Sequence, residues 1–126
     1  MVHGFSLRRV LAASALIVGV VFALGTLSAC GEMPETSADA VIVDVRTPEE
    51  YAGGHLEGAQ NIDFYAPDFV EQVSQLDRNK QYRLYCRSGS RAGQAEQLMK
   101  DTGFNDVASL GSMQTAANAT GKEIVQ

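Results

Sequence analysis

The sequence predicts an α/β domain, a small parallel sheet of about four to five strands flanked by helices. Short apolar runs alternate along the chain with segments of helical pattern, and this alternation is typical of parallel sheets. The first run, AVIVDV at residues 40–45, is β-branched and almost unbroken, which indicates a strand buried on both faces. In such sheets, ligands bind at the carboxyl ends of the strands.

The first predicted strand, residues 40–45, contains one carboxylate, Asp44. A buried carboxylate is costly unless it is paired, so we expect Asp44 near the end of the strand, accepting hydrogen bonds from a loop or an arginine. General-base chemistry is the alternative role. Residues 47–50 (TPEE) then predict a helix start, with a threonine N-cap, proline at N1 and acids in the first turn. Gly53 and Gly54 should end this helix.

The remaining elements alternate in the same way. Further strands are predicted at residues 59–63, 82–86 and 104–110, and further helices at residues 67–76, 92–100 and, weakly, from residue 111. The helix over 67–76 is amphipathic and should bury one apolar face, made of Phe69, Val70, Val73 and Leu76. Gly103 is placed as a helix C-cap residue.

The stretch YRLYCRSGSR, residues 82–91, carries the predicted chemistry. Cys86 ends a strand, and a loop of small and basic residues leads from it into a helix: Arg87, Ser88, Gly89, Ser90 and Arg91. Amides of a tight loop form an anion nest, and the helix N-terminus and the arginines add positive charge. Such surroundings favour a thiolate, so Cys86 is predicted to be an exposed nucleophile. The alternative is an inert cysteine that packs like a small hydrophobe.

His55 is the only histidine after residue 30. It could serve as a base for Cys86, or it could cap backbone carbonyls in a turn. We favour the structural role, because a thiolate stabilised by amides and arginines needs no base. One histidine and one available cysteine do not make a zinc site, so we expect no metal and no cofactor.

Residues 1–29 are predicted to be a lipoprotein signal peptide. Arg8 and Arg9 close a basic start, residues 10–24 are apolar and uncharged, and Leu-Ser-Ala-Cys at residues 27–30 is similar to the bacterial lipobox. Lipid on Cys30 would hold the protein at the outer, extracytoplasmic face of the bacterial cytoplasmic membrane. Residues 30–39 would form a tether and residues 40–126 the domain. An uncleaved anchor helix is the alternative, although the apolar run is short of the about 20 residues that span a membrane.

Without Arg8 and Arg9, eight basic residues remain against fifteen acidic ones, a net charge of −7. An acidic domain is a poor candidate for binding nucleic acid. The arginines beside Cys86 are therefore a local feature. If Cys30 carries lipid, Cys86 is a lone thiol outside the cytosol.

From about residue 39 to residue 125 the chain resembles a single-domain rhodanese. Four segments match that family in order: residues 43–51 (VDVRTPEEY), 54–62 (GHLEGAQNI), 85–92 (YCRSGSRA) and 103–111, with Gly-Phe, Val107 and Leu-Gly in place. The family often has a tryptophan and a closing Gly-x-Pro-Val after the last strand, where this chain has Ala116 and GKEIV. Loss of that aromatic is expected to loosen the C-terminal segment, residues 112–126.

The resemblance implies a sulfurtransferase. Cys86 would take sulfane sulfur from a small anionic donor such as thiosulfate and pass it from a persulfide to a thiophilic acceptor. Residues 87–91 would bind the donor, and Asp44 and Arg46 would brace the loop without taking part in the chemistry. In this family a six-residue loop from cysteine to arginine goes with sulfur transfer, and one residue more suits the related phosphatases and arsenate reductases.

Three other functions stay open. The domain could be a persulfide carrier or sensing module that docks on a partner protein. It could be a phosphatase or arsenate reductase, although the loop from Cys86 to Arg91 has the shorter length and no second thiol is free. A purely structural module would tolerate replacement of Cys86.

Overall fold

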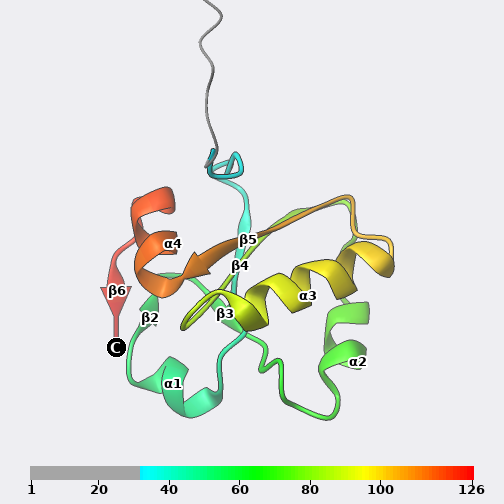
Figure 1. Ribbon diagram of the computed structural model, residues 1–126, viewed down its shortest axis with the longest axis horizontal. Helices are drawn as coiled ribbons and strands as arrows, with labels where there is room; N and C mark the ends of the chain where they lie inside the picture. The colour runs from blue at the N-terminus through cyan, green and yellow to red at the C-terminus, as the bar shows by residue number, and fades with distance from the viewer. Residues whose placement is uncertain (1–31) are drawn as a thin grey trace, which may run out of the picture. The chain divides into compact units, whose positions relative to one another are not determined.

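The computed structural model describes residues 32–126 (Figure 1). The predicted signal peptide and Cys30 lie outside the described residues. The strands are β1 (Val41–Asp44), β2 (His55–Leu56), β3 (Gln60–Asn61), β4 (Gln81–Cys86), β5 (Asp106–Ser112) and β6 (Ile124–Val125). The helices are α1 (Pro48–Ala52), α2 (Phe69–Ser74), α3 (Ser90–Asp101) and α4 (Met113–Thr120). None of these helices has the length and apolar character that crossing a membrane requires.

Four strands form a parallel sheet in the order β3-β1-β4-β5, which confirms the predicted fold class. β4 lies between β1 and β5, so that Leu84 pairs with Val43 on one side and with Ser109 on the other. Beyond Leu84 the register shifts, and Cys86 pairs with Ser112. The bulge in β5 falls at the end of β4 where the cysteine lies.

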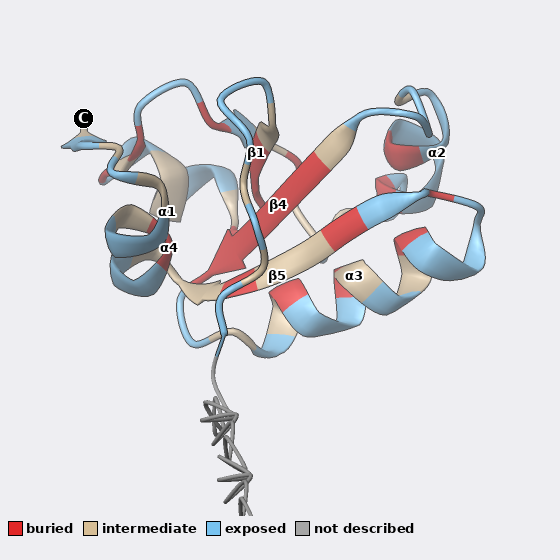
Figure 2. Cartoon of the chain, turned by 90° about the horizontal axis from the view of Figure 1, so that it is seen from above, coloured by how far each residue is buried: buried red, intermediate tan, exposed pale blue. Residues whose placement is uncertain are grey.

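The strands bury both faces, as their apolar composition predicts. Alternate residues of β4 point to opposite sides of the sheet. Leu84 packs in one core cluster with residues of α2 and α3, and Tyr85 packs in a second cluster with Leu110 and Ala116. Figure 2 shows β4 as a mostly buried strand, with α3 buried along one stripe. The central strand is therefore fixed from both sides, and the position of Cys86 at its end is fixed with it.

The helices begin largely where the sequence predicts. Thr47 caps α1, and its side chain and that of Glu50 form a reciprocal capping box. α3 begins at Ser90, two residues before the predicted start, because Gly89 at φ 97° turns the chain directly into the helix. One prediction for α2 is wrong. Val70 is 53% exposed, because only Phe69 and Val73 of this short helix reach the core.

The C-terminal segment does not form the loose end that we expected. α4 follows β5 directly, and β6 pairs with β2 in a separate antiparallel two-stranded sheet. Ala116 is fully buried. Pairing to β2 therefore holds this segment without the aromatic residue.

The segment before β1 is hydrogen-bonded to the sheet. Arg83, whose side chain is 3% exposed, donates to the carbonyl of Glu35 and to the carboxylate of Asp106. The backbone N–H of Ser37 donates to the side chain of Gln81 at 2.7 Å. Part of the predicted tether is thus attached to the start of β4.

Candidate active site

Cys86 is the last residue of β4, and the predicted loop follows it into α3. The backbone N–H of Gly89 donates to Cys86 Sγ at 2.9 Å. The loop also lies close to the bulge of β5. A Cβ built on Gly89 would lie 3.2 Å from the Cα of Gly111. Both the positive φ and this close approach require glycine at position 89, and its amide is thereby directed at the sulfur.

The prediction that Cys86 is exposed is wrong for this conformation, in which the residue has 0% exposure. The loop folds over the sulfur, while Arg87, Ser88 and Ser90 face solvent. The sulfur is not enclosed by hydrocarbon alone, because it accepts the N–H of Gly89. In this conformation the thiol is closed to solvent, so a reactant reaches Cys86 only after the structure around the sulfur rearranges.

Arg91 is bound by a carboxylate that the sequence analysis did not assign to the site. Its Nη1 and Nη2 donate to the two carboxylate oxygens of Glu50 at 2.8 and 3.0 Å. The guanidinium carbon lies 5.4 Å from the centre of the exposed Tyr65 ring. The hydrogen bonds from Arg91 lower the pKa of Glu50 to about 2. The hydrogen bond with Glu50 raises the pKa of Arg91.

The other loop residues form the outer surface of the site. Arg87 and Ser88 are exposed, and Ser90 is the first residue of α3. In the described part of the chain, Arg87 makes no ion pair, so its full charge faces any anion that approaches the loop. The loop amides and one free guanidinium are therefore the available anion-binding groups.

Asp44 and Arg46 form a buried ion pair beside the site. Arg46 donates to Asp44 from its backbone N–H at 2.9 Å and from Nη2 at 2.7 Å. Nη2 also donates to the carbonyl of Gly54 at 2.6 Å. The guanidinium lies 5.7 Å from the ring centre of Tyr85, the residue before Cys86. The pair thus joins the end of β1 to the turn after α1 and to the end of β4, and in residues 32–126 it makes no hydrogen bond to residues 87–91.

His55 belongs to the support of the fold. Its ring stacks on Tyr51 with the ring centres 3.7 Å apart, and Nδ1 lies 2.9 Å from the carbonyl oxygen of Tyr51. This is the structural role that we favoured over base chemistry. Within residues 32–126, no cluster of three or more His, Cys, Asp or Glu residues is arranged to hold a metal ion.

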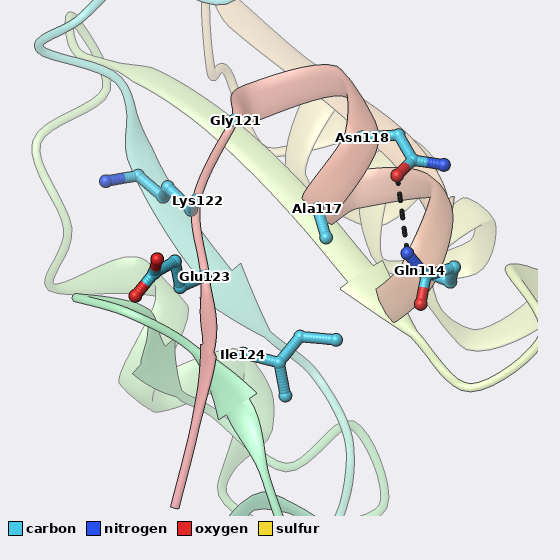
Figure 3. A pocket seen from close by; sticks show the side chains of 7 residues that line it. All are labelled: Gln114, Ala117, Asn118, Gly121, Lys122, Glu123 and Ile124. Atoms are coloured by element: carbon cyan, nitrogen blue, oxygen red, sulfur yellow. Dashed lines mark hydrogen bonds between the residues drawn. The ribbon is translucent and has the colours of Figure 1, made fainter.

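An open hollow lies elsewhere, between α4 and the segment that leads into β6 (Figure 3). It is lined by Gln114, Ala117, Asn118, Gly121, Lys122, Glu123 and Ile124. No residue of the loop 86–91 contributes to it, and Lys122 and Glu123 do not converge there on a common point. The hollow adds nothing to the chemistry of Cys86.

Glu50 and Tyr65 are the site residues that sequence reasoning missed. Glu50 had a sufficient explanation as an acid in the first turn of α1, and in the structure it also forms a capping box with Thr47. Tyr65 lies in a connection outside the predicted elements. Only the folded chain shows that both contact Arg91.

Fold and site together define a class of protein, an α/β domain with a cysteine at the carboxyl end of a central strand and a loop of small and basic residues wrapped over it. The family of the Rhodanese-like domain matches residues 29–116. This chain belongs to the rhodanese family.

Individual relatives agree with this assignment. The thiosulfate sulfurtransferase PspE of Escherichia coli (strain K12) is 31% identical over 77 residues, covering 60% of this chain and 72% of that protein. A tRNA uridine(34) hydroxylase of Shouchella clausii is 37% identical over 76 residues, which are 57% of this chain but only 24% of the hydroxylase. A crystal structure of a Rhodanese_3-like domain of Anabaena sp. is 28% identical, with a TM-score of 0.59 over 68% of this chain and 98% of that one. The family therefore contains domains in different proteins with different activities.

Proposed function

We propose that this protein is a sulfurtransferase that carries sulfane sulfur as a persulfide on Cys86. The observation that carries the proposal is the loop itself. It leads from Cys86 to Arg91 in six residues and directs the Gly89 amide at the sulfur. An amide in this position stabilises negative charge on a thiolate and on the persulfide that replaces it. The name of PspE, a thiosulfate sulfurtransferase of similar sequence, supports the same activity.

The reaction with thiosulfate balances as two displacements. The thiolate of Cys86 attacks the outer sulfur of thiosulfate, the S–S bond breaks, and sulfite leaves with the bonding electron pair. A thiophile such as cyanide then attacks the terminal sulfur of the persulfide, and the thiolate of Cys86 is released with its electrons. Neither step needs an external oxidant or reductant. Arg87 attracts the anionic donor, and the loop amides hold it against Cys86.

The persulfide can be tested directly. The full chain is incubated with thiosulfate, and the peptide that contains Cys86 is analysed by mass spectrometry. We expect the mass of one added sulfur atom, which a later addition of cyanide removes. If no sulfur is added while a thiol reagent still modifies Cys86, the proposed donor chemistry is wrong.

A second candidate function is that of a persulfide carrier that exchanges sulfur with a docked partner protein. The burial of Cys86 favours this function. The closed loop would protect the persulfide between transfers, and a docked partner would open the loop for the transfer. Comparison of single with multiple turnover separates the two functions. An enzyme should turn over many equivalents of a small donor, whereas a carrier should load one sulfur and then release it slowly to small thiophiles.

We also propose that the protein is anchored by lipid on Cys30 at the outer face of the bacterial cytoplasmic membrane. The basic start, the apolar run and the lipobox-like residues 27–30 support this location. Cys30→Ser is expected either to move the protein from the membrane fraction to the soluble fraction or to leave its signal peptide uncleaved, because a lipid chain supplies the membrane affinity. Immunoblots of cell fractions would measure this. An unchanged, fully processed membrane-bound protein would contradict it.

A further inference from the structure

Glu50 holds Arg91 through both of its oxygens, and the fold fixes Glu50 in turn. α1 presents Glu50, and the backbone N–H of Thr47 donates to the same carboxylate at 3.0 Å. The ion pair is partly shielded, since the side chains of Arg91 and Glu50 are 13% and 27% exposed. The Tyr65 ring lies beside the guanidinium. Arg91 is therefore not a free cation beside Cys86.

This pairing changes the charge that an incoming reactant meets. Glu50 stays ionised at any pH at which the protein would work, because Arg91 lowers its pKa to about 2. Two N–H groups of Arg91 are already used, and its unit charge is matched by that of Glu50. The loop amides and Arg87 remain to hold an anion. With one unpaired cation, such a site suits a reactant with one negative charge better than a reactant with two.

We propose that Glu50 is a specificity-determining residue, which offsets the charge of Arg91 and so favours sulfur donors with one negative charge or none over dianionic ones such as thiosulfate. The inference rests on the proposed function and narrows its substrate class to low-charge persulfides and thiosulfonates. Glu50 acts through Arg91 and the local field, and it does not touch the reacting atoms.

The first experiment measures the electrostatic field at Cys86 without a sulfur-transfer reaction. The full chain is alkylated with iodoacetate, which is an anion, and with iodoacetamide, which is neutral and nearly the same size. Rates are read on the peptide that carries Cys86. In Glu50→Gln, the ratio of the iodoacetate rate to the iodoacetamide rate should rise on the order of fivefold at low salt, as expected for loss of one charge several ångströms away. The rise should shrink with added salt.

Glu49→Gln is the matched control. Glu49 precedes Glu50 on α1 and is exposed, and its substitution removes the same charge, but the ion pair of Arg91 is formed with Glu50. Its ratio should stay near that of the unaltered protein. An unchanged ratio in Glu50→Gln, or an equal rise in both variants, would overturn the proposal. Glutamine can still accept one of the two hydrogen bonds from Arg91 through its amide oxygen, so the substitution removes the charge while it keeps part of the contact.

The second experiment compares donors. Thiosulfate has two negative charges and benzenethiosulfonate has one, so kcat/KM for thiosulfate relative to benzenethiosulfonate should rise in Glu50→Gln by a factor similar to the alkylation ratio. The rise should come mainly from a lower KM for thiosulfate. An unchanged or lower donor ratio overturns the proposal. If no donor loads Cys86 in any variant, the proposed function fails, and the alkylation ratio still decides the role of Glu50.

Discussion

Cys86→Ser is expected to abolish sulfur transfer, with a loss of roughly a thousandfold or more in kcat/KM, as expected for removal of a catalytic nucleophile. A serine hydroxyl can accept the N–H of Gly89, so the loop should keep its shape. It cannot form a persulfide. The measurement is thiocyanate production from thiosulfate and cyanide by the full chain, together with the mass of the peptide that contains residue 86.

The control for this prediction is the other cysteine. Cys30→Ser should load sulfur on Cys86 as the unaltered protein does, because residue 30 has no part in the proposed chemistry. The circular dichroism spectrum of Cys86→Ser should match that of the unaltered protein. Transfer that persists in a folded Cys86→Ser variant would show that the sulfur is carried elsewhere.

Asp44→Asn should cause the largest loss of stability, about 3–5 kcal/mol in the free energy of unfolding. The side chain of Arg46 is only 8% exposed and its charge is matched by Asp44, which is fully buried. An amide in place of the carboxylate leaves the guanidinium charge buried without a counter-ion. Urea unfolding of the full chain, followed by circular dichroism, measures the change.

Lys100→Gln is a matched test of a surface ion pair. Lys100 pairs with Glu96 one turn earlier on α3, and its side chain is 49% exposed. Loss of such a pair should cost no more than about 1 kcal/mol. If Asp44→Asn costs as little as Lys100→Gln, the buried pair does not have the role in stability that its geometry indicates.

Local patterns were sufficient to predict most of the fold. The β-branched run placed β1 to within one residue at each end, and the N-cap threonine, the proline and the first-turn acids placed the start of α1. α2 was predicted too long, at residues 67–76, because four apolar residues matched a helical face. One of these four residues, Val70, is exposed to solvent. β2 and β6 were not predicted as a pair. Two-residue strands carry no periodicity, and their pairing depends on contacts far apart in sequence.

The site was predictable where its residues are neighbours in the sequence. The position of Cys86 at a strand end, the glycine turn and the helix after it follow from one continuous stretch. Two features of the site depend on the tertiary fold. The 0% exposure of Cys86 results from a loop that packs against Gly111, and the binding of Arg91 depends on Glu50, 41 residues away. The sequence places the positive charge of Arg91 near Cys86, but only the fold shows that Glu50 balances this charge.

The hydrogen bonds of Arg83 to Glu35 also fix where the segment before β1 lies along the central strand. Glu35 and Ser37 are held near the first residues of β4, whereas Cys86 is the last residue of that strand. The first and last residues of this six-residue strand are roughly 16–17 Å apart. The segment before β1 and the loop over the buried thiol of Cys86 therefore lie at opposite ends of the central strand.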